Sequence, residues 1–130
     1  MMRSSDLQYC LESPYLWFDE TANTLVSKDL EKAEKLLKEA KEKKDPLDQI
    51  NTAYQSLYAA TQALLHSINY KASGFRCVVT VLEEHFIRQG MLERIHLDHL
   101  LRGQKMEGTP QENLGAAEIY LVEVKKIVKK

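Results

Sequence analysis

The sequence predicts an all-α protein, built as an up-and-down antiparallel bundle of about four to five helices in a single domain. Apolar residues recur at spacings of three and four along most of the chain, which is the period of one helix face. No stretch shows the alternation of a strand or the turn signal of a hairpin. Short connections between the patterned segments favour antiparallel neighbours, and 130 residues fit one domain.

Composition and charge narrow the class of protein. Hydrophobic residues make up 44% and charged residues 28% of the chain, so we expect a folded core rather than disorder. A net charge of −1 leaves only local patches to attract RNA, DNA or an anionic membrane. The apolar runs are too short to span a bilayer. Cys10 and Cys77 lack metal spacing and no signal-peptide pattern is present, so we predict reduced thiols in a cytoplasmic protein.

Residues 1–28 carry the least regular pattern of the chain. Large apolar and aromatic residues gather around Pro14 without keeping a helical period: Leu11, Tyr15, Leu16, Trp17 and Phe18. We expect this segment to form a flap or short helix that packs its aromatic side chains onto the main body. The bundle itself is then predicted to occupy residues 29–130.

The first helix of the bundle is predicted from Ser27 to Lys44. Ser27 can cap it, opposite charges lie four residues apart on its outer face, and lysines occupy its last turn, where the helix dipole favours cations. Asp45 and Pro46 supply the cap and the first position of a second helix that reaches about Asn69. The wide apolar arc of this second helix predicts a central position with neighbours on more than one side.

Three further helices complete the predicted bundle. The third begins at Phe75 and stops at Gln89–Gly90, and the fourth runs from about Leu92 to about Gly103. The stretch from Gly103 to Pro110 is predicted to be a loop. The last helix has apolar residues alternately three and four apart, with Tyr120 and Ile127 beside that seam: Leu114, Ala117, Leu121, Val124 and Val128.

Residues 53–90 read AYQSLYAATQALLHSINYKASGFRCVVTVLEEHFIRQG, and this segment resembles the core of the HEPN domain family. That family has a tyrosine-rich helix of the type AYYAxFxAARALL, a short loop, and a helix that ends in a sequence such as GEHFVKTG. The following LLRGQKMEG, residues 100–108, is similar to the segment in which an arginine begins the family's functional motif. The resemblance covers roughly residues 30–128 and implies a HEPN-like helical bundle.

The same resemblance bears on catalysis. HEPN ribonucleases carry an arginine, four to six further residues and then a histidine. Arg102 stands at the place of the arginine, but Glu107, Gly108 and Thr109 follow where a histidine would be. Many relatives also have a Ser/Thr-His pair before the third helix, where this chain has Gly74-Phe75. The resemblance therefore implies a retained fold and a lost ribonuclease motif, and we expect a protein that is not an enzyme.

Four residues are candidates for binding a nucleotide or a partner. Arg102, beside the glycine-rich loop, can reach a phosphate or a carboxylate, or it can cap its helix and face solvent. Glu107 can pair with Arg102, but its charge would repel a phosphate. Tyr58, together with Tyr54, can stack on a base or pack in the core, and its place in the apolar stripe favours the core. Arg76 can add positive potential beside these tyrosines or lie on a solvated face.

Two histidines are candidate metal ligands. His96 and His99 lie three residues apart, on one helix face, but a metal site would need two further ligands. Signatures such as His-Glu-x-x-His are absent from the sequence. We expect these histidines to be surface or interface residues, and we predict no metal and no other cofactor.

The family resemblance supplies the functional expectation. It implies a nucleotide- or nucleic-acid-associated partner module, with a minimal nucleotidyltransferase of a toxin–antitoxin-like pair as the protein partner. The aromatic N-terminal segment and the heptad-like last helix favour a homodimer. Two alternatives stay open: a metal-independent ribonuclease that uses Arg102 with His96 or His99, and a structural dimerisation bundle without a ligand.

Overall fold

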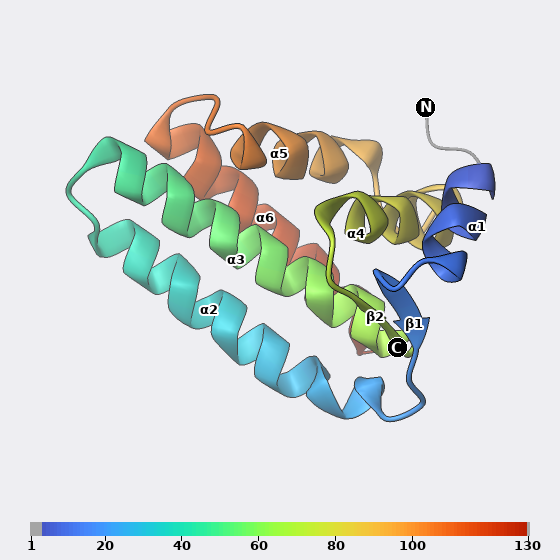
Figure 1. Ribbon diagram of the computed structural model, residues 1–130. Coiled ribbons are helices and arrows are strands. Elements are labelled where there is room, and N and C mark those ends of the chain that lie inside the picture. The colour runs from blue at the N-terminus through green and yellow to red at the C-terminus, as the bar shows by residue number, and fades with distance from the viewer. Residues whose placement is uncertain (1–3, 130) are drawn as a thin grey trace.

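The computed structural model describes residues 4–129 and is mostly helical, as predicted (Figure 1). Three long helices lie side by side: α2 (Val26–Glu42), α3 (Pro46–Ser67) and α6 (Pro110–Val128). The central helix α3 packs against both α2 and α6, in agreement with its wide apolar arc. The shorter helices α4 (Phe75–Leu82) and α5 (Arg94–Gln104) pack against the same central helix. None of the helices within residues 4–129 combines the length and the apolar character needed to cross a membrane.

The helix ends follow from local chemistry. Asp45 caps α3 as predicted, because its carboxylate accepts a hydrogen bond from the backbone N–H of Asp48 at 3.0 Å and Pro46 takes the first helical position. At the start of α6, Thr109 and Glu112 exchange hydrogen bonds between side chain and backbone, at 3.1 and 3.2 Å. This reciprocal cap satisfies two of the helix's first N–H groups and fixes the point where α6 leaves the preceding loop.

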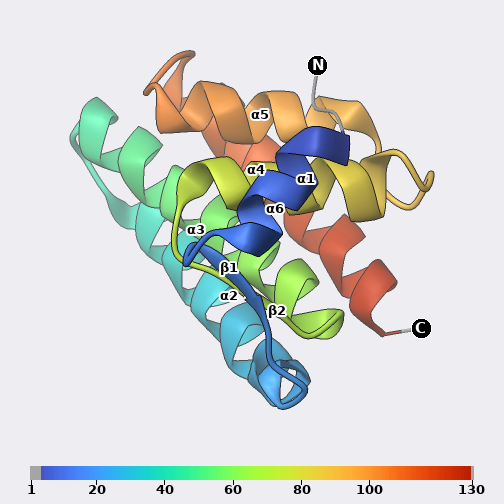
Figure 2. The same ribbon diagram turned by 45° about the vertical axis from the view of Figure 1, so that its right-hand side comes forward.

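The N-terminal segment contains a short helix, one of the two forms expected there, and a strand that the sequence did not predict. Helix α1 (Ser4–Glu12) leads into strand β1 (Leu16–Phe18), and the 3-10 turn Ala22–Leu25 connects it to α2. Strand β1 pairs antiparallel with β2 (Tyr70–Ala72), which follows α3, and Figure 2 shows the two strands side by side. The expectation of no strands is therefore wrong. Strands of three residues are too short to show an alternating pattern.

The expected packing of the N-terminal aromatic residues is also largely wrong. Leu16 is buried, but Tyr15, Trp17 and Phe18 are 49%, 44% and 63% exposed. Alternation along β1 accounts for Tyr15 and Trp17, whose side chains point to the side opposite Leu16. Phe18 points to the same side as Leu16, and its ring lies edge-on to that of Tyr70, with ring centres 6.2 Å apart. Aromatic rings on both sides of β1 are therefore exposed to solvent.

Cys10 and Cys77 form a disulfide that ties α1 to the start of α4. The prediction of two reduced thiols is therefore wrong. The cysteines are 67 residues apart in sequence, but the packing of α1 on α4 brings their Cα atoms to 5.6 Å, within the usual range for a disulfide. Both residues are buried beside Leu16, Leu65 and Val78, in a small apolar cluster separate from the main core.

The third predicted helix is not one regular helix. Helix α4 ends at Leu82 and continues as the π-helical turn Glu83–Ile87, before the chain turns at Gly90. Glu83 is only 2% exposed, and its two carboxylate oxygens accept hydrogen bonds from Arg94 at 2.9 and 2.5 Å. This ion pair joins the π-helical turn to the beginning of α5.

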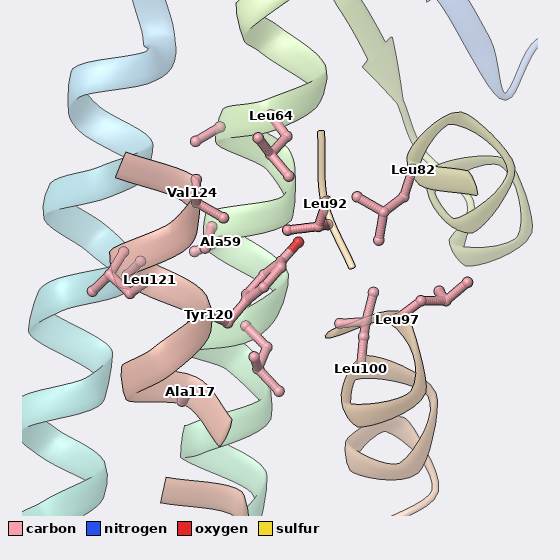
Figure 3. Packing of buried hydrophobic residues seen from close by; sticks show 14 of the residues in the cluster. Ala59, Leu64, Leu82, Leu92, Leu97, Leu100, Ala117, Tyr120, Leu121 and Val124 are labelled. Carbon is pink, nitrogen blue, oxygen red and sulfur yellow. The ribbon is translucent and has the colours of Figure 1, made fainter. Parts of the chain in front are cut away.

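The main core is centred on Tyr120 of α6, which is fully buried (Figure 3). Its hydroxyl lies 2.7 Å from the Thr61 hydroxyl of α3, and Thr61 in turn donates to the backbone carbonyl of Leu57. The predicted seam of the last helix faces this core: Ala117, Leu121 and Val124 are buried, and Leu114 and Val128 are partly buried. Tyr120, which was expected beside the seam, lies at the centre of this core.

Candidate functional site

The four candidate binding residues do not form one site. Arg102 and Glu107 come together at the loop between α5 and α6. Tyr58 lies in a separate groove between α2 and α3. Arg76 lies at the junction of α1 and α4. Each place has its own geometry and charge.

Arg102 lies at the end of α5, beside a small hollow of about 30 Å³. Its guanidinium is 4.0 Å from the carboxylate of Glu107, in the loop, and 3.9 Å from that of Glu112, in the first turn of α6. All three side chains are at least half exposed, so these pairs contribute little to stability. The hollow is lined by residues of α5, α6 and their connection: His99, Arg102, Glu107, Gly108, Glu112, Asn113 and Ala116.

The loop is held in a shape that brings Glu107 back to Arg102. The backbone N–H of Glu107 donates to the Arg102 carbonyl at 2.9 Å, and Gly108 has a φ of +89°, in the left-handed region. The side-chain amide of Asn113 donates to the carbonyls of Glu107 and Thr109, at 3.0 and 2.8 Å. A Cβ on Gly108 would also lie 3.2 Å from that amide, so the loop closes tightly over Asn113.

The charge of this hollow is unfavourable for a phosphate. Hydrogen bonds from the Thr109 backbone and side chain, with a smaller contribution from the Arg102 charge, lower the pKa of Glu112. Two carboxylates, those of Glu107 and Glu112, therefore face one guanidinium. The surplus of negative charge repels a phosphodiester and favours a cationic or neutral group.

The two histidines of α5 differ in their surroundings. His99 lines the Arg102 hollow, whereas His96 is only 5% exposed and its ring lies 5.5 Å from that of Tyr120. The expectation that both are surface or interface residues is wrong for His96, because it shares a helix face with the buried residues Leu100 and Gly103. Burial lowers the pKa of His96. Within residues 4–129, no group of three histidine, cysteine or acidic residues is placed to hold a metal ion.

An open groove with a volume of about 500 Å³ runs between α2 and α3. Tyr54 and Tyr58 line it, with ring centres 6.1 Å apart and ring planes inclined by 43°. Both tyrosines are partly buried against the apolar clusters, so each ring packs on the core and also lines the groove. Burial, with a smaller effect of Tyr58, raises the pKa of Tyr54 to about 12. The rest of the lining is mixed: Asp29, Lys32, Leu36, Gln55, Ala59 and Gln62.

Tyr54 connects the groove to the Arg102 hollow. A Cβ on Gly103 would lie 3.3 Å from Cδ1 of Tyr54 and 3.7 Å from the Asn113 side-chain oxygen. Tyr54 therefore packs on the end of α5 through the space that Gly103 leaves, one residue after Arg102. Tyr54 lines the groove and Asn113 lines the hollow, so a change at Gly103 reaches both.

Arg76 does not contribute to the tyrosine groove. Its guanidinium carbon lies 4.4 Å from the centre of the Tyr9 ring, and the same group pairs with Asp6 at 3.3 Å. These contacts hold α1 against α4, next to the disulfide. Of the two alternatives for Arg76, the structure therefore shows the exposed face, outside the lining of the tyrosine groove.

The sequence missed several residues of the groove and the hollow. Gln55, Tyr58 and Gln62 lie three and four residues apart on α3, so helical spacing alone could have placed both glutamines on the face of Tyr58. Lys32 lies on α2, and its place in the groove depends on the register of α2 against α3, for which no local pattern exists. Glu112 belongs to the capping box of α6. The sequence signature of a capping box is short and common, so it did not mark Glu112 as a residue of the hollow.

Comparison of the chain with protein-family models, with curated proteins and with solved structures finds no match.

Proposed function

We propose that this chain is a HEPN-like binding module that takes a nucleotide in the groove between α2 and α3 and works with a protein partner, rather than by cleaving RNA. The observation that carries the proposal is the pair of tyrosines, Tyr54 and Tyr58, on the groove surface. The family resemblance of residues 53–90 gives the same expectation of nucleotide association.

The lining of the groove suits a nucleobase. Its volume of about 500 Å³ is in the range of small-molecule sites. Tyrosine rings stack on bases of any sequence, and the amides of Gln55 and Gln62 offer both donors and acceptors for the edge of a base. Lys32, which lines the groove from α2, provides a cation for a phosphate. A nucleoside monophosphate matches this lining, because it has a base face for the tyrosine rings, a base edge for the glutamine amides and a phosphate for Lys32.

Titration calorimetry with adenosine and guanosine monophosphates tests this proposal. We expect the Tyr58→Ala variant to bind about tenfold or more weakly, because stacking on one aromatic ring contributes roughly 1–3 kcal/mol per base. The Tyr9→Ala variant is the control, since Tyr9 is a half-exposed tyrosine on α1, outside the groove. Absence of binding by the wild type, or equal binding by Tyr58→Ala, would refute the proposal.

The protein partner proposed from the resemblance is a minimal nucleotidyltransferase, as in a toxin–antitoxin-like pair. Such an enzyme handles nucleotides, which fits a module with a base-sized aromatic groove. Co-sedimentation of the chain with a minimal nucleotidyltransferase tests this point. Two separate boundaries at micromolar protein would rule out a stable complex.

The second candidate is a ribonuclease that uses Arg102 with His99. The observation that favours it is that both side chains line one hollow. It ranks second because Glu107 and Glu112 face the same guanidinium and repel a phosphodiester. An RNA-cleavage assay on the wild type and on Arg102→Ala decides the matter: cleavage that disappears in the variant would establish the enzyme, and absence of cleavage by the wild type would remove it.

A further inference from the structure

One end of the groove between α2 and α3 carries a carboxylate that the proposed nucleotide site has not yet used. Asp29 of α2 lines the groove, and its side chain is 18% exposed. Its Oδ2 lies 2.5 Å from Nδ1 of His66 on α3. Because a carboxylate only accepts hydrogen bonds, the imidazole is the donor. A carboxylate has about four acceptor positions, so this contact fixes the group between two helices and leaves positions for further donors.

The lining residues can be placed in order along the groove, because α2 and α3 run antiparallel (Figure 1). The contact with His66 sets Asp29 beside the end of α3. Further along α2, the Ala33 carbonyl accepts a hydrogen bond from the Ser56 hydroxyl of α3 at 2.7 Å, which fixes the register of the two helices. Gln62 lies one helical turn before His66, on the same face of α3, so it belongs to the Asp29 end of the groove.

The Asp29 end of the groove presents a defined pattern of hydrogen-bonding groups next to an aromatic ring. Tyr58 lies one turn before Gln62 on α3, and Lys32 lies three residues after Asp29 on α2. A base that stacks on the Tyr58 ring therefore has Asp29 and Gln62 beside one of its edges. The carboxylate supplies two neighbouring acceptors, and the amide of Gln62 supplies a donor. This pattern distinguishes one base edge from another.

We propose that the groove selects guanine over the other bases and that the Asp29 carboxylate is the group that recognises it. This inference rests on the proposed nucleotide function and adds the identity of the base. Guanine carries N1–H and its 2-amino group side by side, and these two donors match the two oxygens of a carboxylate. Oδ2 can take part because it keeps a second lone pair beside its contact with His66. The guanine O6, next to N1–H, accepts from the amide of Gln62.

The other bases do not match a carboxylate in this position. Adenine has one donor on this edge, its 6-amino group, and the neighbouring N1 is an acceptor. N1 would face the lone pairs of Asp29, and both groups would lose their hydrogen bonds to water without gaining a partner. Uracil and cytosine also lack two adjacent donors. Hypoxanthine keeps N1–H and O6 of guanine and lacks only the 2-amino group, so it isolates one of the two hydrogen bonds to Asp29.

Titration calorimetry with guanosine, inosine and adenosine monophosphates tests the choice of base. We expect the wild type to bind the guanosine nucleotide about tenfold or more tightly than the adenosine nucleotide, with inosine monophosphate between them. Asp29→Asn should weaken binding of guanosine monophosphate about tenfold and change that of adenosine monophosphate little. The asparagine oxygen still accepts from His66, so the contact between α2 and α3 is kept. Retained binding of adenosine monophosphate also shows that the variant is folded.

The matched control is Glu31→Gln, which removes the same charge from an exposed residue of α2 outside the groove lining. We expect it to keep the preference for guanosine monophosphate. Equal binding of the guanosine and adenosine nucleotides by the wild type would overturn the choice of guanine and leave the nucleotide site standing, whereas no binding of any of the three would overturn both. A guanine preference that survives in Asp29→Asn, or that is lost equally in Glu31→Gln, would overturn recognition by Asp29.

Discussion

The Tyr120 hydroxyl is a polar group in the middle of an apolar core, and Thr61 is its partner. Because Thr61 donates to the Leu57 carbonyl, the tyrosine hydroxyl is the donor in the bond between them. We expect Tyr120→Phe to lower the free energy of unfolding by about 1 kcal/mol, since the ring still fills its space and one hydrogen bond is lost. Urea unfolding measures this, and a loss above 3 kcal/mol would mean that the ring itself had moved.

His96 gives the protein a predictable pH dependence. Burial lowers its pKa, His99 acts in the same direction, and Glu123 and Glu93 partly oppose it. Below the ordinary histidine pKa of about 6.5, the unfolded chain binds a proton that the folded chain resists. Stability is therefore complete above that value and falls as the pH drops toward the lowered pKa of the folded state.

Urea unfolding at pH 7.5 and pH 5.5 tests the role of His96. The wild type should lose stability on acidification, and His96→Gln should lose less of it, because glutamine does not titrate. His99→Gln is the matched control on the same helix, and its stability should depend on pH much as that of the wild type does. Equal acid sensitivity in His96→Gln and the wild type would show that another group titrates.

At the scale of elements, the π-helical turn Glu83–Ile87 offers two ion pairs that differ in burial. Glu83 is 2% exposed and accepts two hydrogen bonds from Arg94, whereas Glu84, which pairs with Arg88, is 10% exposed. We expect Arg94→Ala to lower the free energy of unfolding more than Arg88→Ala does, because Arg94→Ala leaves a fully buried carboxylate without its partner. The Glu84 carboxylate keeps more contact with water when Arg88 is removed. Chemical unfolding of the two variants compares them directly, and equal costs would contradict this account.

The long helices could be predicted because their signals are local and repeated. Helices α2, α3 and α6 each carry several turns of apolar residues at helical spacing. The dipeptide Asp45-Pro46 also marks the beginning of α3. Strands β1 and β2 could not, because three residues hold no period and their pairing joins distant parts of the chain. The widening of α4 into a π-helical turn also has no simple signature in sequence.

The candidate site was predictable only in part, for the same reason. Arg102 and Glu107 are close in sequence, and one loop returns the second to the first, so their proximity could be expected. The groove could not be predicted in this way, because Tyr58 and Lys32 line one groove only as a result of the packing of α3 on α2. The disulfide required the position of α1 on α4, which the irregular pattern of residues 1–28 does not specify.

For the whole molecule, the disulfide is the strongest single constraint on the N-terminal segment. It closes a loop with a sequence separation of 67 residues, which in the chain-entropy description stabilises the fold by about 4 kcal/mol. Urea unfolding of a Cys10→Ser/Cys77→Ser double variant should show a loss of this order. The wild type in dithiothreitol should behave like the variant. If reductant left the wild type unchanged while the variant unfolded early, the serines rather than the missing bond would be responsible.

The same disulfide changes what a cut in the backbone does to the molecule. Residues 10 to 77 form a covalent ring that includes the exposed Lys43-Lys44 connection between α2 and α3. A single cleavage by trypsin at that connection would open the ring without releasing a fragment. The nicked protein would run as one species on a non-reducing gel and as two fragments on a reducing gel. Because the disulfide keeps the two fragments together, the fold of the nicked protein can be measured without loss of either fragment.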